Sequence, residues 1–567
     1  MTPHGGVLLE AWCQLLYDGL VAGGVATVVV SPGSRSTPLV LAASGRADLE
    51  VVTVVDERAA AFYALGRARA EGRPLALVRT SGSAAGHDLP AVIEARAAGV
   101  PLVVLTADRP HELMDARAPQ TIDQLRLFGE QAVGFFDLGL PDPTPRALRA
   151  VRRVGMQAAE LAKHPRPGAV QVNVRARKPL EAPATEGPGE AEFRTDVEQL
   201  REEGAPEVKS LDDLRAAFAS ARRPLLVAGP APVALASELE TQRSQLRALG
   251  VPVVIEATSQ LRFGPGGLGA AGLEAVLRHE AWRRCLEPDL VVQLGEPPVS
   301  TGLQRALSEW SSARWAVAPR GYPDPDSRSH VVRAERGPAL EALVAASREE
   351  GFLDAWRRAE AAAAAAVEEG SSPTPPGEEL SEGIVTRWAR DAVPAGGRLM
   401  VGNSLAVRHL DLYLPPGGSA LDVLHQRGAS GIDGLIAGAI GASQASPCVL
   451  LLGDVSARHD LGALALGTLA GELTVVVLHN GGGRIFEQLP LARQLGDGHP
   501  QLEPFLTEDA RSLVPVAEAL GWTATRVGTT SELREALAAG PSPRLIEAEV
   551  PPHGARDDME GFVRSAA

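Results

Sequence analysis

The stretch VVVSPGSRSTPL, residues 28–39, passes from a run of valines into a loop of small and hydroxyl-bearing residues. The run stops at Ser31, and the loop contains one basic residue, Arg35. A short apolar run predicts a strand, and open α/β folds bind their ligands in the loops at the carboxyl ends of strands. The sequence therefore predicts a binding loop here, and Arg35 raises the question of which anion it binds.

Similar short apolar runs recur along the chain, and most of them precede a small-residue turn and a helical stretch rich in Ala, Leu and Arg. Continuous apolar strands that alternate with helices are typical of parallel sheets covered on both faces. The runs form three groups: VATVVV (25–30), VVTVV (51–55), PLALV (74–78), PLVVL (101–105) and AVQVNV (169–174); PLLVAG (224–229), VPVVIEA (251–257), DLVVQLG (289–295) and RWAVAP (314–319); and RLMVGNS (398–404), PCVLLLGD (447–454), LTVVVLHN (473–480) and RLIEAEV (544–550).

Two polar segments separate these groups. Residues 181–206 and 368–378 are rich in Pro, Gly and Glu, as linkers are. We therefore predict an α/β protein with three consecutive Rossmann-like domains and mostly parallel sheets, at residues 1–182, 205–347 and 377–567. Whether the first and third domains are copies of one fold stays open at this stage.

The bulk composition narrows the class of protein. The formal net charge of the 567 residues is −15, and no basic face is visible, which argues against nucleic acid or an anionic membrane as partner. Cys13, Cys285 and Cys448 are too far apart for a disulfide framework or a CxxC metal site. No basic leader precedes an apolar core at the amino terminus, and no apolar run approaches the ~18 residues of a membrane span. We expect a cytoplasmic protein.

Two polar residues in the third group follow neighbouring predicted strands. Asp454 follows PCVLLLG and Asn480 follows LTVVVLH, with 25 residues between them and a glycine run, 481–483, behind. A carboxylate and an amide oxygen are hard ligands that suit Mg²⁺, and glycines let the backbone approach an ion and its phosphates. An Asp after a strand is by itself more often a helix cap. The spaced pair is more specific and indicates a metal site.

This spacing, GDVS…HN, resembles the GD-x-S…N signature of thiamine diphosphate enzymes. The resemblance implies that Asp454, Asn480 and the backbone carbonyl of Gly482 hold Mg²⁺ (or Mn²⁺), which binds the diphosphate. It also places Val455 and Ser456 in the cofactor site and implies the thiamine diphosphate-binding fold in the first and third domains.

A narrower resemblance rests on SPGSRSTPL, DERAAAFYALG, LTADRP, QTIDQ, GNSLAVR, RGASGIDG and IFEQLP. Together these motifs are similar to the 2-succinyl-5-enolpyruvyl-6-hydroxy-3-cyclohexene-1-carboxylate synthases of menaquinone biosynthesis, with the match strong in the first and third domains. The family is a transferase family. Its reaction decarboxylates 2-oxoglutarate and adds the succinyl-carbanion equivalent to isochorismate in a conjugate, Stetter-like step.

Glu57 lies in the motif DERAAAFYALG, where Asp56, Glu57 and Arg58 follow a predicted strand. The plain interpretation is a charged helix start, because acids are favoured there by the helix dipole. The resemblance gives Glu57 a catalytic role: it shares a proton with the cofactor's aminopyrimidine, whose imino form removes the C2 proton. In the family this Glu comes from the partner subunit, which implies a homodimer or a dimer of dimers.

The resemblance also assigns apolar and basic residues to the site. Ile432 resembles the aliphatic residue that keeps the cofactor bent, and Ile485 and Phe486 resemble the apolar wall over the thiazolium. The arginines in the family motifs suit dicarboxylate substrates, because guanidinium groups bind carboxylates with two parallel hydrogen bonds. The predicted substrate-binding set is Arg35, Arg109, Arg408 and Arg427, with hydrogen bonds from Ser34, Gln120 and Ser404.

One position departs from the family pattern. The family commonly has Pro-Pro-x-Ser-Lys where this chain has PPVST (297–301), so Thr301 replaces a cation. Two alternatives remain open. One is another thiamine diphosphate-dependent 2-oxoacid decarboxylase or an acetohydroxyacid synthase-type enzyme, and the other is a nucleotide-binding regulatory protein without catalysis.

Overall fold

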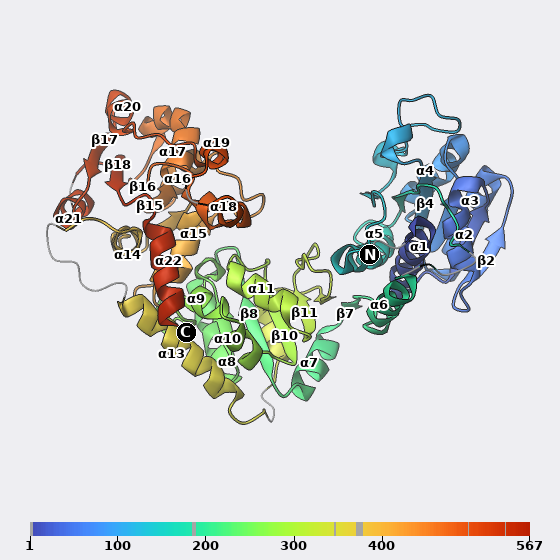
Figure 1. The fold of residues 1–567 in the computed structure, drawn as a ribbon, viewed down its shortest axis with the longest axis horizontal. Coiled ribbons are helices and arrows are strands. Elements are labelled where there is room, and N and C mark those ends of the chain that lie inside the picture. The colour runs from blue at the N-terminus through green and yellow to red at the C-terminus, as the bar shows by residue number, and fades with distance from the viewer. Residues whose placement is uncertain are drawn as a thin grey trace. The chain divides into compact units, whose positions relative to one another are not determined.

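The computed structural model describes residues 4–183, 187, 189–344, 348–369, 378–496, 498–538 and 540–566. It contains three six-stranded sheets, and each lies within one of the three predicted residue ranges (Figure 1). The predicted α/β class with mostly parallel sheets is confirmed. The domain boundaries remain predictions, and positions 1, 347, 377 and 567 lie outside the described residues.

Contacts divide the chain into two units, which are described separately. Unit 1 comprises Met1–Val208 and Asp324–Val331, and unit 2 comprises Lys209–Pro323 and Val332–Ala567. Within the described ranges, no helix has both the length and the apolar character that a bilayer crossing requires.

Unit 1 contains the first sheet, in the order β2-β1-β3-β4-β6-β5, with every neighbouring pair parallel. Successive strand residues point to opposite faces, so Val28 and Val30 pack under α1, α2 and α5 while Val29 packs under α3 and α4. The elements are β1 (Thr27–Ser31), β2 (Glu50–Thr53), β3 (Leu75–Arg79), β4 (Leu102–Asp108), β5 (Gly134–Asp137), β6 (Ala169–Arg175), α1 (Gly5–Ala22), α2 (Thr37–Ser44), α3 (Glu57–Glu71), α4 (Leu89–Ala98), α5 (Pro145–Lys163) and α6 (Glu190–Glu202).

Helix α6 lies inside the segment 181–206 that we predicted as a linker. Its apolar residues Phe193, Val197 and Leu200 follow helical spacing and are buried in the core under α1. The polar composition of the segment concealed this one-sided pattern. The other predicted linker, 368–378, falls mostly outside the described residues.

The second sheet has a different order, β7-β12-β11-β10-β8-β9, and the run from β11 to β9 is parallel. The alanine-rich stretch 359–367 lies in α13 and packs on one face of this sheet. The elements are β7 (Val208–Lys209), β8 (Pro224–Ala228), β9 (Val253–Ile255), β10 (Leu290–Leu294), β11 (Ala313–Val317), β12 (His330–Val332), α7 (Leu211–Ser220), α8 (Ala236–Ala248), α9 (Leu273–Leu277), α10 (Glu280–Cys285), α11 (Thr301–Glu309), α12 (Arg336–Ala342) and α13 (Phe352–Glu369).

The third sheet, β14-β13-β15-β16-β18-β17, is parallel throughout and repeats the strand order of the first sheet. Tyr413 and Phe562 enter the core that covers the second sheet, so these two domains share packing. The elements are β13 (Arg398–Val401), β14 (Asp422–His425), β15 (Cys448–Gly453), β16 (Leu473–His479), β17 (Thr523–Val527), β18 (Arg544–Glu549), α14 (Glu382–Asp391), α15 (Leu405–Tyr413), α16 (Leu435–Ser443), α17 (Asp454–His459), α18 (Pro490–Leu495), α19 (Glu503–Leu506), α20 (Val514–Ala519), α21 (Thr530–Ala538) and α22 (Gly554–Ser565).

Candidate active site

The predicted metal ligands lie at the carboxyl ends of two adjacent strands of the third sheet. Strands β15 and β16 are paired in parallel, so Asp454, directly after β15, and Asn480, directly after β16, reach the same edge. Both side chains are buried, with 2% and 6% of the residue exposed. The Asp454 carboxylate accepts hydrogen bonds from the amides of Val455 at 2.7 Å and Gly481 at 3.0 Å.

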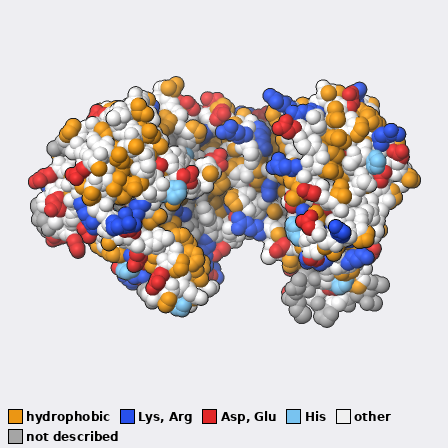
Figure 2. Space-filling view, turned by 90° about the horizontal axis from the view of Figure 1, so that it is seen from above, with side chains coloured by type: hydrophobic (Ala, Val, Ile, Leu, Met, Phe, Trp, Pro, Cys, Tyr) orange, Lys and Arg blue, Asp and Glu red, His pale blue; other side chains and the backbone are white. Residues whose placement is uncertain are grey.

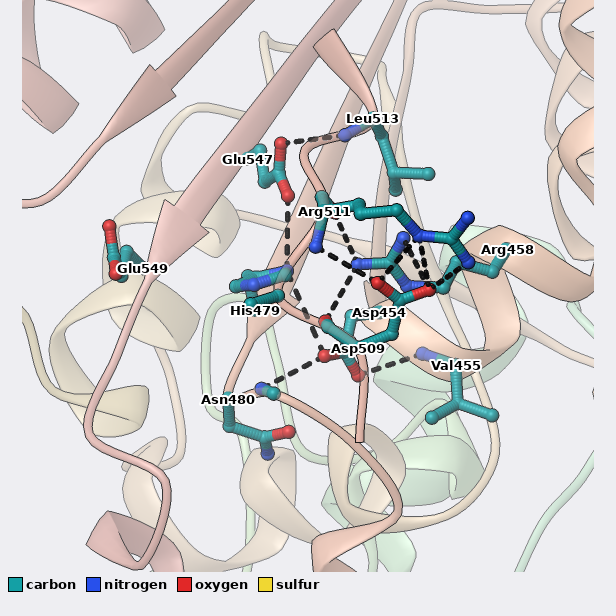
Figure 3. Close-up of polar contacts among 12 residues, drawn as sticks. Asp454, Val455, Arg458, His479, Asn480, Asp509, Arg511, Leu513, Glu547 and Glu549 are labelled. Carbon is teal, nitrogen blue, oxygen red and sulfur yellow. Dashed lines mark hydrogen bonds and ion pairs between the residues drawn. The ribbon is translucent and has the colours of Figure 1, made fainter. Parts of the chain in front are cut away.

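A histidine separates Asp454 from a second buried carboxylate. In Figure 3 the His479 ring lies between the two acids, with Nδ1 at 3.0 Å from Glu547 Oε1 and 3.8 Å from Asp454 Oδ2. Burial raises the pKa of Asp454, and the neighbouring His479 opposes that shift. A cation bound at this edge would oppose it further, because it favours the charged carboxylate.

The Asn480 amide is oriented by a carboxylate from another element. Its Nδ2 donates to Glu382 Oε1 at 2.9 Å, and Glu382 is the first residue of α14. Its Oδ1 is buried and has no hydrogen-bond partner among the described residues. This unsatisfied oxygen, at the strand end next to that of Asp454, suits the binding of a cation.

The glycine run after Asn480 is required by the backbone. Gly482 has a φ of +143°, and a Cβ there would lie 2.3 Å from the Leu506 carbonyl oxygen. The Gly483 amide donates to the same oxygen at 2.6 Å. Within the described ranges, no group of three or more His, Cys, Asp and Glu residues forms a metal site. The candidate donors are instead one carboxylate, one amide oxygen and a backbone carbonyl, which suit Mg²⁺.

Two predicted arginines lie near the same sheet edge. Arg408 Nη1 donates to the Ser404 carbonyl at 2.6 Å, and Arg427 Nη1 donates to Asn403 Oδ1 at 2.8 Å. Burial lowers the pKa of Arg408, and the Arg427 charge lowers it further. Ser404 has a φ of +66°, a conformation that costs energy for a residue other than glycine and is often found at functional sites.

Arg408 lines a cavity of about 590 Å³ inside unit 2. The cavity brings together residues from α11, α15, α22 and the loop after β16, including Ile485 and Thr301. Ile485 and Phe486 are half-buried, and the Phe486 ring lies 5.5 Å from that of Phe505. Ile432 is also half-buried, beside Gly431, whose carbonyl accepts from Asn403.

The remaining predicted residues lie in unit 1, in the loops after the strands of the first sheet. Arg35 is buried, donates from Nη1 to the Ala176 carbonyl at 2.6 Å and has a pKa lowered by burial and by Arg109. Arg109 donates to the Pro119 carbonyl at 3.0 Å, and Gln120 donates to the Ser81 carbonyl at 3.0 Å. Ser34 is exposed in the short helix Ser34–Ser36.

Glu57 is the first residue of α3, and Asp56 caps that helix by accepting from the Ala59 amide at 2.8 Å. Glu57 is half-buried, and its carbonyl accepts from Arg79 Nη2 at 3.2 Å. Arg79 is itself fully buried in a 2.9 Å ion pair with Asp88. The capping role therefore belongs to Asp56, which leaves the Glu57 side chain available for another role.

The sequence-based prediction missed the buried groups that hold these side chains. Glu382, His409, His479 and Glu547 all contact a predicted metal ligand or its partner. His479 was detectable, because it directly precedes Asn480 at a strand end. The others carry no local signal.

Comparisons with known proteins agree on one family. Residues 12–127 match the family described as thiamine pyrophosphate enzyme, N-terminal TPP binding domain. Three relatives carry the name 2-succinyl-5-enolpyruvyl-6-hydroxy-3-cyclohexene-1-carboxylate synthase. The one from Sorangium cellulosum is 44% identical over 97% of this chain and 94% of its own length. Those from Geobacillus kaustophilus and Haloarcula marismortui are 40% and 36% identical, over 86% and 93% of this chain and 86% and 92% of their own lengths. The chain therefore belongs to the 2-succinyl-5-enolpyruvyl-6-hydroxy-3-cyclohexene-1-carboxylate synthase family, enzymes that use thiamine pyrophosphate (thiamine diphosphate).

Proposed function

We propose that this enzyme decarboxylates 2-oxoglutarate and joins the remaining four-carbon unit to isochorismate. The observation that carries the proposal is the composition of one sheet edge, where Asp454 and Asn480, whose Oδ1 has no partner among the described residues, accompany Arg408 and Arg427. Such an edge has ligands for a cation and donors for substrate carboxylates. The names of the relatives support the same reaction.

We propose that Asp454, Asn480 and the Gly482 carbonyl hold Mg²⁺ (or Mn²⁺), and that Val455 and Ser456 contact the diphosphate. Val455 and Ser456 belong to the first turn of α17, directly after Asp454. When bound, thiamine diphosphate supplies a carbon centre that adds to the keto group of the 2-oxo acid and accepts the electron pair left by CO₂. Ile432, Ile485 and Phe486 would exclude water around that centre, because all three present apolar side chains.

The arginines would bind the carboxylates of the two substrates. Arg408 and Arg427 are partly desolvated, and the Nε of Arg427 is buried without a hydrogen-bond partner among the described residues. Desolvated guanidinium groups bind carboxylates more strongly than exposed ones do. Arg35, Arg109, Ser34, Gln120 and Ser404 complete the proposed substrate-binding set.

Glu57 would hold a proton at the pyrimidine ring nitrogen of the cofactor and take it back. Because this residue comes from the partner subunit in the family, we propose a homodimer or a dimer of dimers. Figure 2 shows apolar side chains gathered in patches on the molecular surface. In unit 1, Phe62, Tyr63 and Ile93 on α3 and α4 are 43–45% exposed, which suits helices that a second copy covers. The cytoplasm remains the expected compartment.

The test is an assay with Mg²⁺, thiamine diphosphate and 2-oxoglutarate, run with and without isochorismate. We expect loss of isochorismate absorbance that depends on 2-oxoglutarate, with one CO₂ released for each isochorismate consumed. Release of CO₂ without loss of isochorismate would favour a simple 2-oxoacid decarboxylase. No turnover of either substrate would contradict the proposal.

A further inference from the structure

The Asn480 side chain lies between a buried carboxylate and the proposed metal position. Its Nδ2 donates to Glu382 Oε1 at 2.9 Å, while its Oδ1 is buried without a partner among the described residues. A side-chain amide has a donor end and an acceptor end of nearly equal size, so shape alone does not select its orientation. A metal ion binds only the oxygen end.

Glu382 can make this selection because its Oε1 is the acceptor of the 2.9 Å hydrogen bond from Asn480 Nδ2. The Asn480 nitrogen must then face Glu382, and the oxygen must face away from it. We propose that Glu382 is a positioning residue that fixes the Asn480 amide with Oδ1 turned toward the bound metal. This inference rests on the proposed function, because it assumes a cation between Asp454 and Asn480.

Glu382 is itself held from several sides. It is the first residue of α14, where the helix dipole favours a negative charge, and Ser381 caps the same helix. Its Oε2 lies 2.9 Å from His409 Nε2, and both side chains are buried. The His409 ring packs against Tyr413 with centroids 5.3 Å apart, and the Tyr413 hydroxyl donates to Asp558 at 2.7 Å. His409 of α15 therefore contacts the carboxylate directly, and Tyr413 and Asp558 are linked to it through the His409 ring.

The other proposed side-chain ligand needs no such partner. Both oxygens of the Asp454 carboxylate can bind a cation, whichever way the group is turned, and each already accepts a backbone amide. The selection problem exists for Asn480 alone. Partners of this kind commonly affect metal affinity by about 10–100-fold.

The test measures Mn²⁺ affinity in the presence of thiamine diphosphate, by electron paramagnetic resonance of free Mn²⁺. Glu382→Met keeps the side-chain length and removes the acceptor, so we expect affinity to fall about 10–100-fold. Asp558→Asn is the control: it removes a carboxylate at the far end of the same chain of contacts, away from Asn480, and should leave affinity within a few-fold of wild type. Thermal melting establishes that each variant is folded.

A polarity swap tests orientation independently of packing. Asn480→Asp alone places two carboxylates together and should weaken binding. In the double variant with Glu382→Gln, the glutamine amide donates and the aspartate accepts, which reverses the wild-type hydrogen bond. The double variant should therefore bind Mn²⁺ more tightly than Asn480→Asp alone. Wild-type affinity in folded Glu382→Met, or no recovery in the double variant, would overturn the positioning role alone. A wild-type protein that binds no Mn²⁺ with thiamine diphosphate would contradict the proposed function as well.

Discussion

The first and third sheets share one strand order, and their corresponding strand ends carry different side chains. The residue after the third strand of the first sheet, β3, is Thr80, whereas the residue after the corresponding β15 is Asp454. The residue after β4 is Arg109, whereas the residue after β16 is Asn480. The shared topology thus supplies equivalent positions, and the side chains decide whether an edge suits anions or a cation.

The two edges also differ in how their acids are neutralised. In the first sheet Asp88 and Asp108 are buried against Arg79 and Arg175, at 2.9 and 3.1 Å. The ion-pair partner that the described residues give Asp454 is His479, at 3.8 Å. A buried carboxylate without a close arginine ion pair has the stronger need of a bound cation. This difference supports our proposal of a metal site at the edge of the third sheet rather than the first.

The largest effect is expected at Glu57, the first residue of α3, which we propose handles a proton of the cofactor. Glu57→Gln keeps the size and a hydrogen-bonding amide but removes the carboxyl group that can donate a proton and take it back, so turnover and C2 hydrogen–deuterium exchange of the bound cofactor should slow by about 10²–10⁴-fold. Quenched-flow NMR measures the exchange, beside a titration that shows the site is filled. If C2 exchange stays fast in Glu57→Gln with the cofactor bound, Glu57 has no catalytic role and only favours the start of α3.

The metal assignment predicts a large effect at only one of two equivalent positions. Asp454→Ala should weaken thiamine diphosphate binding by more than about 100-fold, because it removes a direct ligand rather than a supporting partner. Thr80→Ala, at the matching strand end of the first sheet, should leave the affinity unchanged. Calorimetric titration of thiamine diphosphate in the presence of Mg²⁺ measures the affinity of both variants. Equal affinities for Asp454→Ala and Thr80→Ala would contradict a metal site at the third sheet alone.

The arginines of the third sheet should affect substrates rather than the cofactor. Arg408→Ala and Arg427→Ala each remove a charged donor from a desolvated carboxylate, at a cost of about 2–4 kcal/mol in kcat/KM. Arg511→Ala, an exposed arginine paired with Asp509, is the control. Unchanged kcat/KM for both substrates in both variants would make these two residues ordinary surface charges.

The smallest effect is expected one residue from Glu57, at the helix cap. The hydrogen bond from the Ala59 amide lowers the pKa of Asp56 below its value in the unfolded chain. The stabilisation that the Asp56 carboxylate gives to the folded protein is therefore present at neutral pH and is lost as the pH falls through the folded-state pKa. Asp56→Ala should therefore lower the melting temperature slightly at pH 7 and hardly at all near pH ~2. The C2 hydrogen–deuterium exchange rate of thiamine diphosphate bound to Asp56→Ala should equal the rate in the wild-type enzyme.

The strands that the sequence predicted are mostly the buried ones. The strands that it missed are β5, β7, β12, β14 and β17, and all but β12 are at sheet edges. Edge strands such as β5 and β17 are only half-buried, so their residues need not be continuously apolar. The apolar-run criterion therefore identifies most strands in the middle of each sheet and, among the edge strands, only β2 and β9.

The site divides in a similar way. The adjacency of Asp454 and Asn480 could be predicted because each follows a strongly apolar strand, and parallel strands bring their carboxyl ends together. Glu382 could not be predicted, because an acid that follows Ser381 at a helix start has an ordinary explanation. Its contact with Asn480 spans 98 positions in the sequence and exists only after folding.

The central claim is that the two similar sheets provide complementary parts of one site, with Glu57 contributed by the partner subunit. Co-expression of Glu57→Gln and Asp454→Ala chains with different tags allows the hybrid dimer to be purified and assayed with 2-oxoglutarate and isochorismate. The account predicts that each homodimer is nearly inactive and that the hybrid regains activity, because one of its sites combines an intact Glu57 with an intact Asp454. A hybrid as inactive as the two homodimers would contradict the claim, since every site would then contain one of the two defects.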